Sequence, residues 1–183
     1  ARRADAARWD LLVVELSSYQ LELPLNLQLR AAVLTNLAPD HLDRYADLEA
    51  YYATKRGLLA ALPAGAVFVA PSAEIERFDG GAEALPAVDV SDWSRSSALN
   101  GEHGASNLAQ AVAVARHMGC TDSDARQVAV DFAGLPHRNV DLGVIDGLRY
   151  VDDSKATNVA ASVAAIGGVA DPCVVLLGGA GKG

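Results

Sequence analysis

The chain has 183 residues, of which 51% are hydrophobic, so it can bury a substantial core and is not a disordered tail. It carries 15 basic and 23 acidic residues, a formal net charge of −8, and no cluster of Lys and Arg longer than the Arg2–Arg3 pair, which argues against a nucleic-acid-binding face. Cys120 and Cys173 lie far apart without a Cys/His pattern, and no apolar run can span a bilayer. We therefore expect a cytoplasmic protein with two reduced, buried thiols, no zinc site and no membrane insertion.

The first part of the chain predicts an α/β domain with a mostly parallel sheet. Its apolar runs have the character of strands buried on both faces, and they alternate with an amphipathic helix. The strands are expected at 11–16, 31–37 and 66–70, and the helix at 47–62. Functional groups of such sheets lie at the carboxyl ends of strands, which here directs attention to Glu15 and the 36–45 loop.

The middle of the chain has a weaker pattern, followed by two helices. Short strands are expected at 85–90 and 93–99. A helix at 107–119 ends at a glycine, and a second helix at 123–133 would have Asp122 or Ser123 as its N-cap.

A Gly-Leu-Pro break at 134–136 marks a change of organisation. Beyond it the sequence predicts a hairpin about Asp146–Gly147, then a helix from Val159 capped by Thr157 or Asn158, and a buried strand at 173–179. We place a domain boundary near 134–138, which gives domains 1–134 and 135–183.

An acidic residue interrupts the first apolar run. A buried carboxylate is costly without a cation or hydrogen-bond donors, so Glu15 is either bonded to the hydroxyls of Ser17 and Ser18 or serves as a metal ligand at a strand end. The loop PDHLDRY (39–45) gathers four charged or titratable side chains, which is typical of a solvated turn and also of a binding loop.

Two lysines and a glycine turn complete the candidates. Lys155 precedes a helix N-terminus that is itself positive, so it calls for a bound anion unless it simply pairs with Asp152 or Asp153. Lys55 lies within an amphipathic helix, where a surface lysine is the default interpretation. The closing LLGGAGKG, which contains Lys182, fails the GxxxxGK[ST] pattern of a phosphate-binding loop.

Seven stretches, in this order, resemble the Mur ligase family over essentially the whole chain. They are ELSSYQLE (15–22), TNLAPDHLDRY (35–45), YYATKRGLL (51–59), GEHGASNLAQA (101–111), GLPHR (134–138), DDSKATN (152–158) and LLGGAGKG (176–183). The GLPHR and DSKATN signatures are similar to those of the ligases that join D-glutamate to UDP-N-acetylmuramoyl-L-alanine. Two positions depart from the family pattern: Gly104 stands where Asn is common, and Ala180 where Asp is common.

This resemblance implies an ATP-dependent amide ligase of peptidoglycan precursor synthesis, which makes an acyl phosphate and then an amide with D-glutamate. Its fold would be the second half of a P-loop-type central ATP-binding domain, followed by the start of a Rossmann-like C-terminal domain. The family's GTNGKT phosphate loop is expected upstream of residue 1, so the chain without the missing parts of the same polypeptide is expected to be inactive. Two alternatives stay open: a non-catalytic nucleotide-binding module, and a related Mur or folylpolyglutamate-type ligase.

The resemblance also implies a metal and catalytic set. Glu15 and His41 would bind magnesium, expected as two ions, together with Lys55, which corresponds to the family's carbamylated lysine. A carbamate is an anion with oxygen donors, which a hard cation prefers to an ammonium. Lys55, His41 and Lys155 would be the catalytic residues.

The remaining implied roles concern the nucleotide and the other substrates. Asn107 would meet the adenine of ATP, and Arg138 and Asp153 its phosphates and ribose. The substrate-binding residues would be Thr157 and Lys182, near the acyl phosphate and D-glutamate with Lys155, and Ser17.

Overall fold

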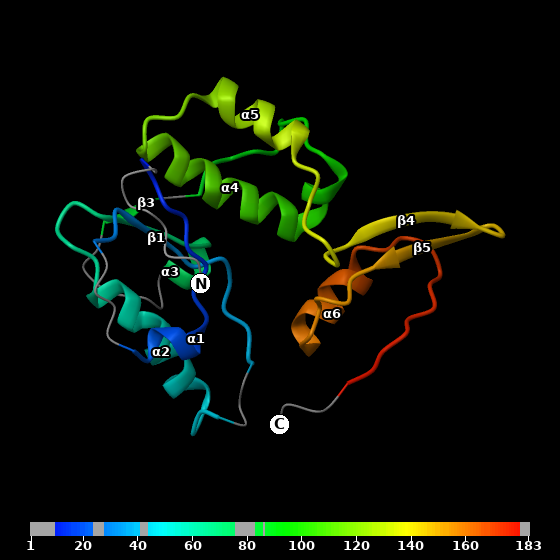
Figure 1. Ribbon diagram of the computed structural model, residues 1–183, viewed down its shortest axis with the longest axis horizontal. Helices are drawn as coiled ribbons and strands as arrows, with labels where there is room; N and C mark the ends of the chain where they lie inside the picture. Colours follow the sequence, from blue (N-terminus) through cyan, green and yellow to red (C-terminus); the bar gives the residue numbers. More distant parts are fainter. Residues whose placement is uncertain (1–9, 24–27, 41–43, 76–82, 86, 180–183) are drawn as a thin grey trace.

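The computed structural model describes residues 10–23, 28–40, 44–75, 83–85 and 87–179 (Figure 1). Its elements, in chain order, are α1 (Ser18–Leu21), β1 (Ala31–Val33), α2 (Leu48–Ala60), β2 (Val67–Val69), α3 (Ser72–Ile75), β3 (Glu83–Leu85), a 3-10 helix (Ser97–Leu99), α4 (Gly101–His117), α5 (Asp122–Asp131), β4 (Val140–Ile145), β5 (Leu148–Asp152) and α6 (Val159–Gly167). Helices and strands alternate along much of the chain, as an α/β fold requires.

A parallel three-stranded sheet has the order β1-β2-β3, so the predicted parallel sheet is confirmed. The central strand β2 has the sequence VFV, whose β-branched and aromatic side chains suit a strand buried on both faces. Val67 and Val69 are fully buried. Leu59 of α2 packs with Ala32 and Phe68 in the core beside this sheet.

The sheet is covered by helices on two sides (Figure 1). α2 begins at Asp47, whose carboxylate accepts a hydrogen bond from the Ala50 amide at 2.8 Å, and it ends shortly before Pro63. α4 contacts β2 and carries α5 on its outer side. A second core forms there around Trp93, Leu108 and other buried residues from the loop before α4, α4 itself and α5.

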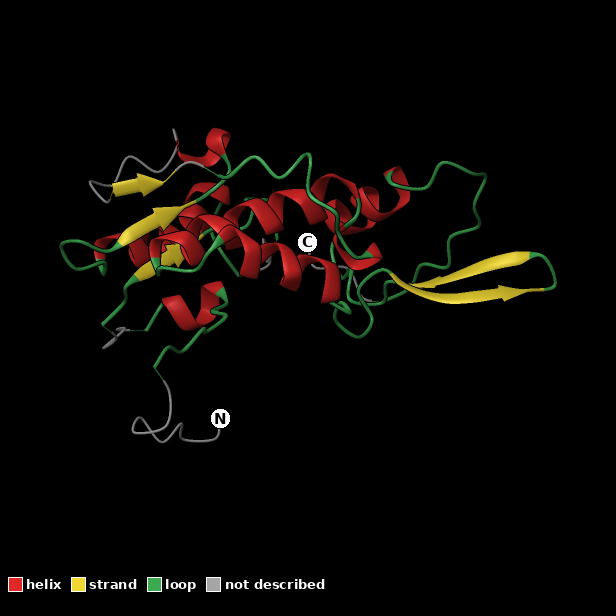
Figure 2. Ribbon diagram, turned by 90° about the horizontal axis from the view of Figure 1, so that it is seen from above, coloured by secondary structure: helices red, strands yellow, loops and turns green. Residues whose placement is uncertain are grey.

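The hairpin and α6 form a separate group that extends away from the sheet (Figures 1 and 2). The predicted turn is confirmed: Asp146 and Gly147 have φ values of 51° and 79°, as a two-residue type I′ hairpin turn needs. Asn158, one of the two expected caps, caps α6. The boundary near 134–138 remains a proposal.

Three expected strands do not form in this structure. The runs 11–16, 93–99 and 173–179 have no strand partner among the described residues. A strand buried on both faces needs paired neighbours and covering helices. Val13 is instead 89% exposed and Leu176 is 95% exposed. The hydroxyl-rich 93–99 stretch forms the 3-10 helix, because Ser side chains and turns compete with strand pairing.

Smaller differences concern element ends. The strand expected at 85–90 lies earlier, at Glu83–Leu85, and α4 begins at Gly101, six residues before the predicted start at 107. The N-cap of α5 is Thr121 rather than Asp122 or Ser123, since its hydroxyl accepts from the Asp124 amide at 3.2 Å. Cys120 and Cys173 are both exposed, so the predicted burial of the two thiols is wrong. No helix in the described part of the chain has the length and apolar character needed to cross a membrane.

Candidate functional site

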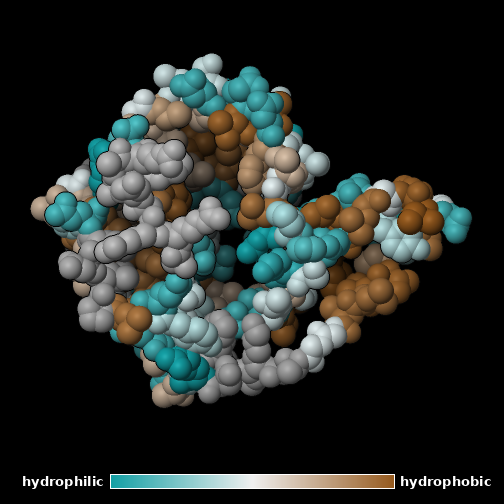
Figure 3. Space-filling view, viewed as in Figure 1, coloured by the Kyte–Doolittle hydropathy of each residue, from teal (hydrophilic) through white to brown (hydrophobic). Residues whose placement is uncertain are grey.

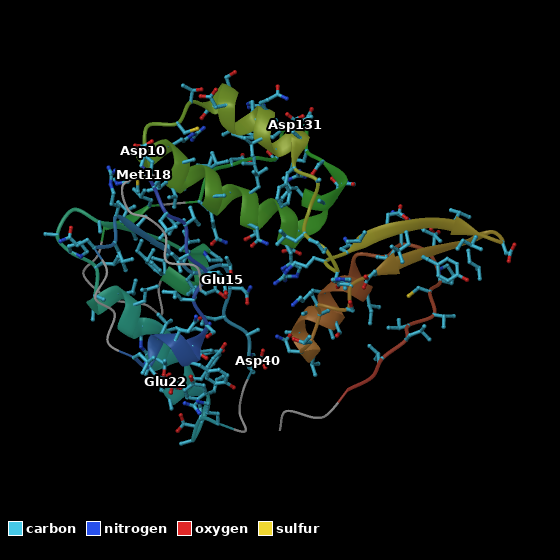
Figure 4. The ribbon with its side chains drawn as sticks, viewed as in Figure 1. Asp10, Glu15, Glu22, Asp40, Met118 and Asp131 are labelled. Carbon is cyan, nitrogen blue, oxygen red and sulfur yellow. The ribbon has the colours of Figure 1, made fainter. Side chains whose placement is uncertain are left out.

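Lys55 on α2 lies beside two carboxylates from distant segments. It is half-buried, and its ammonium nitrogen lies 5.0 Å from the centroid of the Tyr51 ring. Burial lowers the pKa of Lys55, while the negative charges of Glu15 and Asp40 act in the opposite direction. Lys55 of α2 therefore interacts electrostatically with the 11–17 segment and with the loop after β1, whose carboxylates Glu15 and Asp40 are labelled in Figure 4. The surface-lysine interpretation does not fit this position.

The electrostatic environment of this cluster is mixed. Burial, followed by the charge of Asp40, raises the pKa of Tyr51 to about 12, so its phenol stays neutral. Glu15 is exposed, which differs from the predicted burial in a strand. The neighbouring Ser17 hydroxyl donates to Gln20 Oε1 at 2.9 Å and accepts from the Gln20 amide, as part of the capping box of α1. This leaves the Ser17 hydroxyl engaged locally and Glu15 accessible.

The fit of this cluster to magnesium depends on Lys55. Glu15 and Asp40 supply carboxylate oxygens, which hard cations prefer, whereas a protonated Lys55 would compete with a cation. Within the described ranges, no three His, Cys, Asp or Glu side chains are grouped so that they could hold a metal. His41, the expected histidine ligand, lies outside the described residues, as does Lys182. The donor set fits magnesium if Lys55 is an anionic carbamate.

A second group forms where the GLPHR and DDSKATN stretches meet. His137 Nδ1 lies 2.7 Å from Asp152 Oδ2, and the Lys155 amide donates to the His137 carbonyl at 3.0 Å. Asp153 Oδ1 accepts from the Asn139 amide at 3.0 Å. The two loops are therefore tied together by backbone and side chain.

Unusual backbone conformations flank Arg138. His137 and Asn139 have φ values of 64° and 49°, in the left-handed region that non-glycine residues seldom adopt. Such conformations persist only where neighbouring contacts enforce them, and they concentrate at functional sites. Arg138 is exposed between them, so its guanidinium is accessible to an anion.

Lys155 and Thr157 are exposed just before the N-terminus of α6. The proposed pairing of Lys155 with an acidic neighbour is not what the structure shows: Asp152 bonds His137, and Asp153 bonds the Asn139 amide. Lys155 therefore lies where the helix N-terminus and a lysine could share an anionic ligand.

One hydrogen bond joins the two groups. Asn158 Nδ2 donates to Asp40 Oδ2 at 3.0 Å, in a partly buried position. Of the remaining predicted residues, Asn107 is exposed on α4. The structure thus brings Glu15 near Lys55. It also joins the loop of Arg138 to the loop that contains Asp153, Lys155 and Thr157.

Gln110 supports the loop of the candidate site and was not predicted from the sequence. It is 1% exposed, and its Nε2 donates to the Thr35 carbonyl at 3.1 Å and to Ser106 Oγ at 3.3 Å. Thr35 follows β1, so α4 anchors the start of the loop that carries Asp40. A lone glutamine in the apolar run LAQAVAVA was the available signal.

A second missed group anchors the other end of that loop. Glu22 accepts hydrogen bonds from the Arg44 guanidinium through both oxygens, and from Tyr45 Oη at 2.7 Å. The hydrogen bonds of Arg44 and then Tyr45 lower the pKa of Glu22 to about 2. Arg44 also lies over the Tyr19 ring at 4.8 Å. The sequence showed these residues, but not that α1 would be their partner.

A parallel sheet covered by helices, with charged side chains gathered beyond β1, is an α/β domain of the kind that places functional groups at the carboxyl ends of its strands. Residues 1–79 match the Mur ligase middle domain family. The UDP-N-acetylmuramoylalanine–D-glutamate ligase of Zymomonas mobilis is 38% identical over 165 residues, which cover 84% of this chain and 37% of that protein. The ligase of the same name from Nitrosococcus oceani is 34% identical over 205 residues, covering 95% and 44%.

The chain is therefore similar to members of the Mur ligase family, and it spans less than half the length of these curated relatives. Among solved structures, MurF from Acinetobacter baumannii superposes with a TM-score of 0.57 at 16% identity, over 68% of this chain and 33% of that one. This structural likeness supports the α/β fold.

Proposed function

We propose that the chain is part of an ATP-dependent ligase that joins D-glutamate to UDP-N-acetylmuramoyl-L-alanine in peptidoglycan precursor synthesis, in the cytoplasm. Residues 1–134 would belong to the central ATP-binding domain and 135–183 to the Rossmann-like domain. The observation that carries the proposal is the convergence of Glu15 and Lys55, joined through Asp40 and Asn158 to the Lys155 loop. The names of the curated relatives support the choice of substrates.

The described side chains suit a reaction that depends on positioning and charge. Acyl-phosphate formation develops negative charge on phosphoryl oxygens, which placed cations stabilise. Lys155 and Arg138 would supply such charge, and Asp153 would orient the nucleotide. Magnesium, when bound, would neutralise phosphate charge; Glu15, His41 and Lys55 would hold it.

Carbamylation of Lys55 is part of the proposal. Carbon dioxide adds to the neutral amine, which forms an N–C bond and releases one proton to solvent, leaving the carbamate anion. The pKa of Lys55 is lowered chiefly by burial, which raises the neutral fraction. The resulting anion would replace an ammonium that opposes cation binding. A non-catalytic module would have no need for a half-buried lysine facing two carboxylates, so this arrangement favours the ligase.

The test uses the complete ligase that contains this chain, with ATP, UDP-N-acetylmuramoyl-L-alanine and D-glutamate. We expect D-glutamate-dependent phosphate release, its loss in Lys55→Ala, and partial recovery with bicarbonate plus a short carboxylic acid. Lys55→Arg, which keeps the charge but cannot form the carbamate, is the matched control and should not recover. Turnover with another amino acid in place of D-glutamate would identify a related ligase, and no recovery of Lys55→Ala would refute the carbamate.

A further inference from the structure

The side chain of Asn158 makes a hydrogen bond at each end of its amide. Its Oδ1 accepts from the Ala161 amide at 2.8 Å and so caps α6. Its Nδ2 donates at 3.0 Å to Asp40 Oδ2, from a residue 118 positions away in the sequence. Both bonds are partly buried. A single side chain therefore connects the start of α6 to the loop that follows β1.

Capping alone does not explain an asparagine here. Ser and Asp cap helices about as well as Asn. A carboxylate, however, only accepts hydrogen bonds, and a serine oxygen lies too near the backbone to serve both partners. The asparagine amide presents an acceptor and a donor on opposite sides, which is what the two partners require.

On one side, Asn158 is attached to the loop of Lys155 and Thr157. The Thr157 amide donates to the Lys155 carbonyl at 2.9 Å. Ser162 Oγ, in the first turn of α6, donates to the Ala156 carbonyl at 3.3 Å. These bonds make the loop and the first turn of α6 one unit, so holding Asn158 holds the whole loop.

On the other side, Asp40 lies in the loop that follows β1. Its charge acts on both Lys55 and Tyr51 of α2. Its loop starts at Thr35, whose carbonyl is held by the buried Gln110. Figure 4 shows Asp40 on the side of its loop that faces α6. Asp40 is therefore the partner of Asn158 in a loop whose first residue is held by α4 and whose charge reaches α2.

We propose that Asn158 is a positioning residue, which sets the placement of the Lys155–Thr157 loop relative to the Asp40–Lys55 cluster. The amide-to-carboxylate bond is charge-assisted and partly shielded from water, so it is stronger than a neutral surface bond. The catalytic consequence rests on the proposed ligase function, whereas the link itself does not.

The link is tested in this chain by amide hydrogen exchange of α6, with α4 as the internal reference. Asn158→Ser keeps a capping oxygen but cannot reach Asp40, and Asp40→Ala leaves the cap intact. We expect each to speed exchange in α6 about tenfold, the loss typical of a hydrogen bond to a charged group. The double variant should be no faster than either single one, because both remove the same bond.

Two results would overturn the link. One is unchanged α6 exchange in Asp40→Ala, whose cap is untouched. The other is a double variant whose acceleration is the product of the two single ones, which would mean independent effects. If Asn158→Ser fails to fold, Asp40→Ala still decides the question through the first result.

The catalytic role is tested in the complete ligase. Asn158→Ser should lower kcat about tenfold or more, since small misplacements of a catalytic group have large effects. In a Lys155→Ala background the same change should cost less than about twofold, because the group that Asn158 places is gone. Equal losses in both backgrounds would show a merely structural role. A wild-type protein without D-glutamate-dependent turnover would refute the ligase proposal and leave the exchange test standing.

Discussion

At the residue scale, two lysines illustrate how surroundings determine chemistry. Lys55 is half-buried beside Glu15 and Asp40, so burial disfavours its ammonium form. Lys155 is exposed, next to the N-terminus of α6. A neutral amine suits carbamate formation, whereas a solvated cation suits the binding of a phosphoryl or carboxylate group. The same residue type therefore has two distinct proposed uses.

Lys155→Ala gives the most direct test of the anion role. We expect the complete ligase to lose roughly 10²-fold in kcat, by analogy with the removal of other preorganised electrostatic donors. Its melting temperature should change little, because an exposed loop cation contributes little to stability. Arg149→Ala, an exposed cation of the hairpin, is the control and should keep kcat. A Lys155→Ala enzyme with near-normal kcat would show that Lys155 is a loop lysine with no role in catalysis.

Glu22 predicts a particular acid response. Hydrogen bonds from Arg44 and Tyr45 lower its pKa from 4.5 to about 2 in the folded chain. Its stabilising contribution is therefore complete above pH 4.5 and is lost as the pH falls toward 2. As the pH falls from 4.5 to 2, the urea midpoint of Glu22→Gln should decrease less than that of wild type. The difference should be modest, because solvent screens the exposed ion pair. A slope equal to that of wild type would contradict the assignment, and Glu102→Gln provides an exposed control.

At the element scale, features that depend on neighbouring residues could be predicted from the sequence, whereas contacts between distant segments could not. The Asp146–Gly147 turn and the α6 cap depend on residues next to one another, and the sequence predicted both. The Asn158–Asp40 bond and the Gln110–Thr35 bond join distant segments, which no periodicity reveals. The runs 11–16 and 173–179 have strand character, yet strand formation depends on partners that the run itself does not contain.

Gly104 and Gly57 both lie inside helices, so alanine substitutions there separate the helix propensity of the residue from the space around it. A Cβ at 104 would lie 2.4 Å from the Leu99 carbonyl oxygen, whereas at 57 nothing lies within 4 Å. Gly57→Ala should therefore raise the free energy of unfolding by about 0.5–1 kcal/mol. Gly104→Ala should lower it by about 1–3 kcal/mol, because backbone cannot yield as a side chain can.

Urea unfolding of both alanine variants measures this difference. A Gly104→Ala protein at least as stable as wild type would show that the 3-10 helix moves aside without cost. The same contact gives a physical reason for the departure from the family pattern at this position: an asparagine at 104 would need a different path for residues 97–99.

At the scale of the whole molecule, apolar surface is unevenly distributed. The sheet and its helices have buried cores, whereas the hairpin, α6 and the segment after it expose many large apolar side chains (Figure 3). A second run of exposed apolar side chains lies at 11–14 and includes Val13. Contiguous exposed apolar surface marks places where another protein surface, a membrane or a ligand can pack. The sequence predicted strands at the apolar runs 11–16 and 173–179. It could not predict their exposure, because burial depends on the segments that surround them.

The last prediction uses this exposure. Val13→Glu and Leu176→Glu replace side chains that are 89% and 95% exposed. In the 183-residue chain they should change the free energy of unfolding by less than about 0.5 kcal/mol and weaken binding of the dye ANS. In the complete ligase, where we expect these runs to be buried strands, each should cost more than about 2 kcal/mol, because an unpaired carboxylate would be buried.

Val67→Glu, at a fully buried position, should unfold both proteins. Equal tolerance in the chain and in the ligase would show that the runs stay exposed, and intolerance in the chain would show that they are already packed.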